Sequence, residues 1–539
     1  MALSGRGADH TPMDQDPTPS PARPSPGYFD PPESQRPSML PVGRGPASPR
    51  SVAGLWVALG VLCYLIFGLQ LMNHAGPDEL PDPAKYSSVQ LKLMGRYIVG
   101  AKSWGMPLEG VAPQIDELAA SNVIDRLRGA SVICELLGPA EGLDRLDHLD
   151  LLLADADDDE EAIAGLQEDS ALMRRAFEVA AAQQPPPPAS DSTDSSEPTD
   201  AADSGATEPA VAIAETLSPP EPLTAAERQR LIDRHGWFGE LAIAQEPGAS
   251  VRAAIESGGQ RAIIALLCFA ILGGGAILIG FALFIIAMVM AGTGRIRFGY
   301  AQTQTRFPKP NPAFLEAAVL FLLLFIGIQV VVGIAAAVVD IEAIAKPLSL
   351  ILMWLVALIA FWPLSRGVSF AHLRAAYGWH ANGAGFGGVI REIGLGVMAY
   401  LAGLPIVLGG VLITVVLMAL TSAETTHPIQ GEVEIHSLWD AIYLYVLAAI
   451  WAPLVEETIF RGAMFNAMRQ WTGLLASAAV TAFAFAIIHP QGYAGVPVLM
   501  ALAINFAVMR EWRGSLVPAI TAHALHNGSL ITMLVLVLA

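Results

Sequence analysis

The sequence predicts an all-α fold, a polytopic transmembrane helical bundle of about nine membrane helices with an extramembrane helical insert near its N-terminus. The first observation is composition, because 53% of the 539 residues are hydrophobic. The second is that the apolar residues form runs of about 18 or more, the length that a helix needs to cross a bilayer. The third is charge: residues 74–260 hold 34 of the 50 acidic residues against 13 Lys and Arg, so the acidity belongs to one segment outside the membrane.

The N-terminal region predicts a tail followed by a membrane anchor. Residues 1–50 are rich in Pro, Ser, Gly and Asp and lack apolar periodicity, which indicates disorder. The apolar run 52–72 comes next. A cleaved signal peptide is the alternative, but the tail and the run are both too long for the usual signal-peptide pattern, so a transmembrane anchor is favoured.

The acidic segment predicts three parts. Amphipathic stretches with apolar residues near i, i+3 and i+4 indicate a small extramembrane helical domain over 74–182. A disordered acidic linker over 183–222 and one amphipathic juxtamembrane helix over 223–260 follow. We interpret the acidic domain as a solvated module, and recruitment of a basic partner is the alternative.

The remainder, residues 262–539, predicts eight further membrane segments. Lys and Arg gather in alternate loops between them, which predicts a cytoplasmic N-terminus and an extracytoplasmic acidic domain and C-terminus. We expect a multi-pass integral membrane protein in contact with the lipid bilayer, in the plasma (inner) membrane if the source is bacterial. The eight expected segments are 262–291, 317–339, 347–364, 393–420, 441–469, 473–490, 496–509 and 515–539.

Two classes of function are not expected. The three cysteines stand apart, with neither a CxxC pair nor a zinc knuckle among them, so neither redox chemistry nor a structural metal cluster is expected. The three cysteines are Cys63, Cys134 and Cys268. No nucleic acid is expected as a partner.

Ionisable groups in the last four segments are the candidates for function, because such groups are costly inside a bilayer. The stretch "LVEETIFRG" places Glu456, Glu457 and Arg461 in one membrane helix. Glu457 and Arg461 are four residues apart and share a helix face, so they are expected to form a structural pair. Glu456 is turned about 100° away and is expected to point elsewhere.

Two further motifs bring other groups toward Glu456. The midpoint between Glu456 and His489 falls at the short turn between their helices, so both are expected at the same depth. On the last helix, His523 and Asn527 are four residues apart and share one face. Together these groups suit hydrolysis, with Glu456 and His489 holding and deprotonating a water molecule and His523 with Asn527 stabilising an oxyanion.

The three motifs together resemble the CAAX protease and bacteriocin-processing (CPBP, or Abi) family of intramembrane endopeptidases. The family signature of Glu-Glu-x-x-x-Arg, Phe-x-x-x-His and His-x-x-x-Asn is present as "EETIFRG", "FAIIH" and "HALHN", all within residues 441–527. The resemblance implies that 262–539 is an intramembrane protease domain. It implies hydrolysis of a peptide bond in a membrane-associated protein or peptide and, in eukaryotic members, removal of the last three residues of prenylated CAAX proteins.

The resemblance also raises the question of a metal. Members are often described as zinc metalloproteases, and Glu456, His489 and His523 would form an open three-ligand zinc site. The same groups suit a metal-free mechanism in which glutamate activates water, and HExxH is absent. The metal-free mechanism is slightly favoured, and zinc stays open.

Two alternatives from other classes remain. The first is a noncatalytic membrane scaffold, or a bacteriocin-immunity or partner-binding protein, that keeps the polar groups for helix packing. The second is a transporter with a carboxylate proton relay, which no inverted repeat supports. The substrate stays open between a prenylated CAAX protein and, for a bacterial owner, a leader peptide or another membrane protein.

Overall fold

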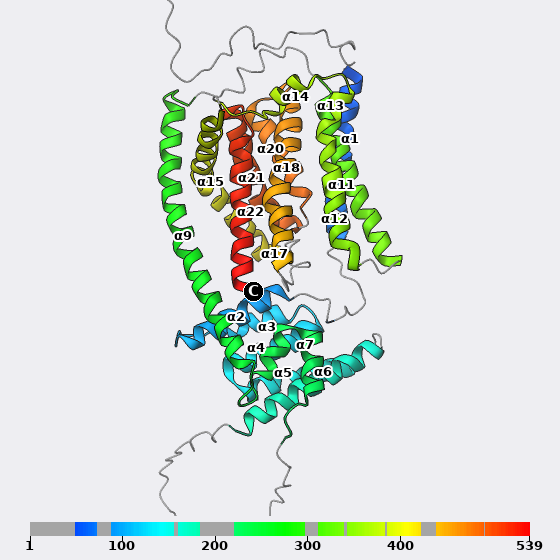
Figure 1. The fold of residues 1–539 in the computed structure, drawn as a ribbon, viewed down its shortest axis with the longest axis vertical. Helices are drawn as coiled ribbons and strands as arrows, with labels where there is room; N and C mark the ends of the chain where they lie inside the picture. Colours follow the sequence, from blue (N-terminus) through cyan, green and yellow to red (C-terminus); the bar gives the residue numbers. More distant parts are fainter. Residues whose placement is uncertain are drawn as a thin grey trace, which may run out of the picture.

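The computed structural model describes residues 49–72, 83, 88–155, 160–183, 220–296, 311–338, 342–382, 385–421, 438–489 and 491–538. Every element in these ranges is a helix, so the all-α prediction is confirmed. The tail predicted over 1–50 and the linker predicted over 183–222 lie almost entirely outside the described residues. The long helices stand side by side above a separate group of shorter helices (Figure 1).

The shorter helices form a separate bundle with its own core. Leu146, Leu149, Met173, Phe177 and Leu231 are among its buried residues and come from helices on both sides of the linker. Burial of these apolar side chains stabilises the bundle through the hydrophobic effect. Its helices are α2 (Val89–Ser103), α3 (Ala112–Ala119), α4 (Val123–Leu137), α5 (Pro139–Ala154), α6 (Glu160–Ala181), α7 (Ala225–His235) and α8 (Trp237–Ile243).

The prediction of a single juxtamembrane helix over 223–260 is wrong. Gly236, at φ 54°, ends α7 and turns the chain into α8, a backbone conformation that glycine adopts without steric cost. α7 is tied to α6 because the buried carboxylate of Asp169 accepts hydrogen bonds from Arg230 Nε (3.1 Å) and Arg234 Nε (2.6 Å). Residues 225–243 are therefore part of the bundle.

Helix α9 (Arg252–Gly292) connects the bundle to the long helices without a break. Its 41 residues make it about 60 Å long, twice the thickness of a bilayer core. Helix α2 crosses α9 so closely that a Cβ on Gly100 would lie 2.2 Å from the carbonyl oxygen of Gly259. Nearby, Arg96 Nη1 donates to the carbonyl oxygen of Val537 (3.2 Å), so the C-terminal end of the chain lies against the bundle (Figure 1).

Five helices in the described ranges are long and apolar enough to cross a membrane, or six if one bent pair forms a single span. Three more of the nine predicted spans coincide with apolar helical stretches of 10–17 residues, Val52–Ile66, Ala313–Ile328 and Leu474–Ile487. The bent pair, Ile351–Ser365 and Phe370–Tyr377, turns by 119°. The five are Arg252–Gly292, Gly385–Thr421, Leu438–Arg469, Gly492–Arg513 and Val517–Leu538.

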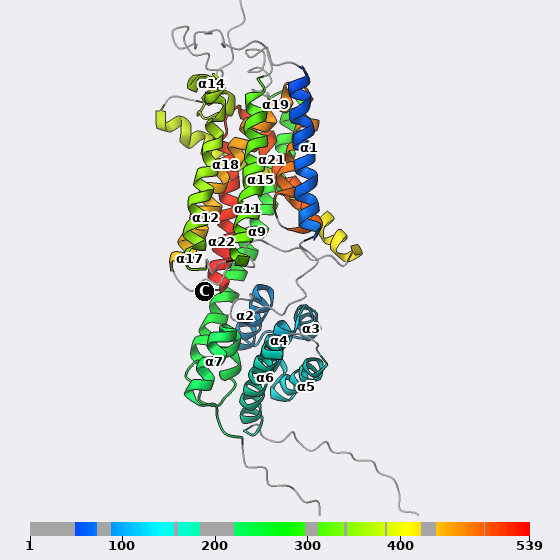
Figure 2. The same ribbon diagram turned by 90° about the vertical axis from the view of Figure 1, so that its right-hand side faces the viewer.

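The helices outside the bundle follow the chain in this order. They are α1 (Pro49–Met72), α9, α11 (Ala313–Val338), α12 (Glu342–Ala357), the 3₁₀ turn η2 (Leu358–Phe361), α13 (Trp362–Ser365), α14 (Phe370–Tyr377), α15 (Gly385–Thr421), α17 (Leu438–Leu444), the π-helical segment η3 (Tyr445–Trp451), α18 (Ala452–Glu457), the π-helical segment η4 (Thr458–Met464), α19 (Phe465–Arg469), α20 (Leu474–Ile487), α21 (Gly492–Arg513) and α22 (Val517–Leu538). Seen from the side, the long helices among them run roughly parallel above the bundle (Figure 2).

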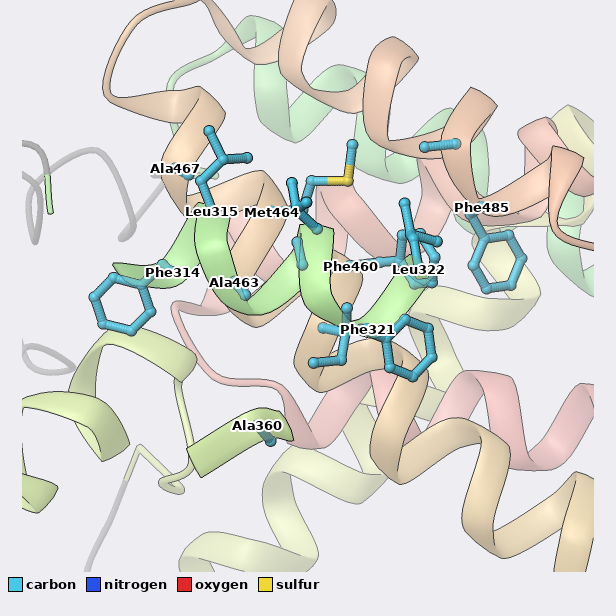
Figure 3. Packing of buried hydrophobic residues seen from close by; sticks show 14 of the residues in the cluster. Phe314, Leu315, Phe321, Leu322, Ala360, Phe460, Ala463, Met464, Ala467 and Phe485 are labelled. Atoms are coloured by element: carbon cyan, nitrogen blue, oxygen red, sulfur yellow. The ribbon is translucent and has the colours of Figure 1, made fainter. Parts of the chain in front are cut away.

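Two kinds of contact hold the long helices together. Phe321 and Leu322 of α11 pack against Phe460 and Met464 of η4 in the largest apolar core (Figure 3). Small residues also let α15 approach α21 closely. A Cβ on Gly410 of α15 would lie only 2.8 Å from the Cβ of Ala501 on α21. Close approach through small residues is a common way for membrane helices to associate.

Candidate active site

The helical segment that carries the two glutamates changes its hydrogen-bond pattern twice. It is π-helical on both sides of α18, in η3 and in η4. Pro453 explains part of this, because it has no amide hydrogen and lies five residues after Ala448. The i→i−5 pattern of a π-helix would pair Ala448 with that missing hydrogen, so this carbonyl is open to another donor. π-Helical turns are frequent at functional sites.

The two neighbouring carboxylates face different partners. Glu457 is fully buried, and its Oε1 accepts a hydrogen bond from Arg461 Nη1 (3.0 Å). Arg461 Nη2 donates to the carbonyl oxygen of Ala503 in α21 (3.1 Å). Pairing of this kind offsets the cost of burying both charges. Glu456 is also buried, and its Oε2 has no hydrogen-bond partner among the described residues.

His489 follows the last turn of α20 and faces Glu456. Its Nδ1 donates to the carbonyl oxygen of Phe485 (2.7 Å), one turn earlier in the same helix. In the neutral imidazole this bond places the proton on Nδ1 and leaves Nε2 as an acceptor. Nε2 lies 3.9 Å from Glu456 Oε2, so the chain brings the predicted carboxylate and histidine together.

His523 of α22 contacts both glutamates. Its Nδ1 lies 3.0 Å from Glu457 Oε1, and its Nε2 lies 4.0 Å from Glu456 Oε2. An ionised carboxylate only accepts hydrogen bonds, so Nδ1 is the donor in this contact. Glu457 therefore orients His523 in addition to pairing with Arg461.

Aromatic rings enclose these polar groups. The ring of Phe485 lies 4.6 Å from that of His489 and 5.9 Å from that of His523, measured between centroids. The guanidinium of Arg461 lies over Phe485, 4.6 Å from its centroid. A cation gains electrostatic attraction from the ring face, and the gain is larger when water is excluded. The ring of Phe485 thus lies against both histidines and stabilises the charge of Arg461.

Asn527 lies one turn after His523, but its side chain has a different partner. Its Nδ2 donates to the carbonyl oxygen of Ala448 (2.8 Å), the carbonyl that Pro453 leaves open. One of the two hydrogens on Asn527 Nδ2 thus joins α22 to η3. His526, which the helix turns to another face, contacts the hydroxyl of Tyr400 on α15 through Nδ1 (3.1 Å).

The predicted zinc ligands do not lie at zinc-ligand spacing. Tetrahedral zinc with bonds of about 2.0–2.2 Å holds its ligands about 3.3–3.6 Å apart. The distances from Glu456 Oε2 to the two imidazole nitrogens are 3.9 and 4.0 Å. No group of three His, Cys, Asp or Glu residues in the described part of the chain is arranged to hold a metal ion. A bridging water molecule with hydrogen bonds of about 2.8 Å separates its partners by about 4.0–4.6 Å, which matches these distances better.

Sequence reasoning missed several residues around the site. The i, i+4 spacing of Glu457 and Arg461 gives each charge a partner within one helix. The spacing therefore gave no reason to expect the contact from Glu457 to His523, which lies far along the chain on another helix. Trp379 also escaped notice, although its Nε1 donates to Thr458 Oγ1 (3.0 Å) directly after Glu457. The indole N–H of a Trp near the membrane needs a hydrogen-bond acceptor, but the presence of a Trp in the sequence does not say which residue supplies that acceptor.

Comparisons with known proteins found one family model that is similar to this region. Residues 437–529 match the family model described as "Type II CAAX prenyl endopeptidase Rce1-like". The match confirms the resemblance that the three motifs indicated, and it covers a minor part of the chain. Neither the curated proteins nor the solved structures gave a significant match.

Proposed function

We propose that this chain, which carries an Rce1-like domain of the type II CAAX prenyl endopeptidases over residues 437–529, is an intramembrane endopeptidase. It hydrolyses a peptide bond of a membrane-associated protein or peptide with a water molecule activated by Glu456 and His489. The observation that carries the proposal is the convergence of two imidazole Nε2 atoms, 3.9 and 4.0 Å away, on the otherwise unpartnered Glu456 Oε2.

The first step is activation of water. A water molecule between Glu456 Oε2 and His489 Nε2 donates one hydrogen bond to each. The carboxylate takes one proton while the water oxygen attacks the carbonyl carbon of the substrate, which is general base catalysis. Because His489 Nδ1 is fixed on the carbonyl oxygen of Phe485, its Nε2 is aimed at the water without further reorganisation.

The second step is collapse of the tetrahedral intermediate. His523, protonated on both nitrogens, donates from Nε2 to the oxyanion, and Glu457 stabilises the imidazolium through Nδ1. As the carbonyl group re-forms, the bond between its carbon and the peptide nitrogen breaks, and the proton held by Glu456 passes to the leaving amine. No step requires a metal, and Asn527 supports the position of α22 through Ala448.

The test uses purified full-length protein in liposomes and two internally quenched peptides that end in Cys-aliphatic-aliphatic-X, one farnesylated and one not. Release of the last three residues by wild-type protein, and not by the His489→Ala or His523→Ala variants, supports the proposal. Cleavage of both peptides alike supports an endopeptidase that does not need a prenyl group on its substrate. Full cleavage by both variants contradicts the mechanism.

The noncatalytic alternative has a different signature. A scaffold acts through a stable complex, so its partner should be recovered with the Glu456→Gln variant as well as with wild-type protein. For an endopeptidase, the same variant instead accumulates an uncleaved protein that wild-type cells convert to a shorter form. Quantitative proteomics of membranes from the two strains separates these outcomes.

A further inference from the structure

The imidazole of His523 needs more than its hydrogen bond to face Glu456. The bond from Nδ1 to Glu457 Oε1 fixes one atom of the ring, whereas rotation of the terminal torsion of a histidine is otherwise broad. A second contact must hold the plane of the ring. Phe506 of α21 supplies it, because its ring is stacked on His523 with centroids 5.1 Å apart and planes at 19°.

Phe506 is itself held firmly. Its side chain is 1% exposed and packs in a small apolar cluster that joins α21 to α22. The guanidinium of Arg461 lies 5.2 Å from the centre of its ring. Phe506 therefore contacts both His523 and Arg461, the two residues that share Glu457 Oε1 as their hydrogen-bond acceptor. The other members of the cluster are Leu502, Met509, Ala519 and Ala522.

From these contacts we infer that Phe506 is a positioning residue, which holds the imidazole plane of His523 so that Nε2 faces Glu456. The inference rests on the proposed function of that site. Phe485 has a broader role, since it contacts both histidines, whereas Phe506 contacts only His523 of the two within the described chain.

Phe460 offers a matched control. It is 0% exposed, lies 6.0 Å from the Arg461 guanidinium and packs on Phe321 and Phe485, and no ring contact joins it to either histidine in the described ranges. Phe506→Leu and Phe460→Leu thus remove the same atoms from equally buried positions. Both lower the melting temperature, because both remove buried aromatic area.

The experiment measures cleavage of the quenched peptides and the structure of the variants. Phe506→Leu should lower kcat at least tenfold with KM within about twofold, while Phe460→Leu changes kcat by no more than about twofold. Phe506→Tyr keeps the ring and should retain kcat within about threefold of wild type. Equal losses in the two leucine variants, or a tyrosine variant as slow as Phe506→Leu, overturn the inference.

A structure of Phe506→Leu gives a readout that does not depend on activity. The inference expects the imidazole of His523 to turn, so that its Nε2 moves away from the 4.0 Å separation from Glu456 Oε2. An unchanged imidazole overturns the inference and leaves the proposed function intact. Full activity in Glu456→Gln instead removes the proposed function, whatever the variants of Phe506 do.

Discussion

Glu457 and His523, from two different helices, are joined by a contact of 3.0 Å between Oε1 and Nδ1. The same oxygen accepts the hydrogen bond from Arg461 Nη1. One buried carboxylate therefore serves the fold and the site together. This shared acceptor leads to a prediction in which stability and activity separate.

Replacing Glu457 with Gln should lower the free energy of unfolding by about 3–5 kcal/mol, because it leaves the guanidinium of Arg461 buried without a counter-charge. The double variant Glu457→Gln, Arg461→Met removes both charges and should recover most of that loss. It should still lack activity, because no carboxylate stabilises the imidazolium of His523. Chemical unfolding in detergent and peptide cleavage measure the two properties. An active double variant would show that His523 does not need Glu457.

Asn527 provides a second prediction. Substitution by Ala leaves the carbonyl of Ala448 without its donor, which should cost about 1–3 kcal/mol of stability. Because its amide faces that carbonyl, kcat should fall less than tenfold when measured at a temperature where the variant is folded. A loss of about 10²–10³ would instead assign Asn527 the oxyanion role that its motif suggested.

Much of the fold follows from local patterns in the sequence, whereas the site depends on contacts between distant segments. Long apolar runs and the spacing of Glu457 and Arg461 report on single helices, so they predicted helices and one ion pair. Gly236 broke the helix predicted over 223–260, because a single glycine inside an amphipathic pattern does not reveal its φ angle. The partners of Asn527 and Phe506 depend on how α21, α22 and η3 pack, which periodicity does not encode.

Two adjacent glycines of α15 test the packing of that helix. A Cβ on Gly410 would lie 2.8 Å from Ala501 Cβ and 2.9 Å from the carbonyl oxygen of Pro497, whereas a Cβ on Gly409 would meet nothing within 4 Å. Gly410→Ala should therefore destabilise the protein by about 1–3 kcal/mol. Gly409→Ala should be neutral or stabilising by up to about 1 kcal/mol. Thermal unfolding of the two variants compares them, and equal melting temperatures would refute the close approach of α15 and α21.

The bundle of α2 to α8 should lose stability in acid through Glu135. Burial alone would raise the pKa of Glu135, but hydrogen bonds from Arg252 and Gln245 outweigh it and hold the pKa below its usual value. A lowered pKa stabilises the folded state above the unfolded value of about 4.3, and this stability is lost as the pH falls through the lower folded value. Hydrogen exchange of α4 and α8 in the full-length protein between about pH 3 and 6 measures the loss.

Glu135→Gln should flatten this pH dependence. Glu256 gives the matched control, because it pairs with the same Arg252 but its side chain is 45% exposed, so Glu256→Gln should change little. An unchanged acid transition in Glu135→Gln, or an equal change in both variants, would count against the role of Glu135.

The measurement that tests the central claim most directly is the single-turnover rate of peptide cleavage by Glu456→Gln. This variant keeps the size of the side chain and removes the base. We predict a rate about 10²–10⁴-fold below that of wild-type protein at an unchanged melting temperature. A rate equal to that of wild-type protein would contradict the activation of water by Glu456.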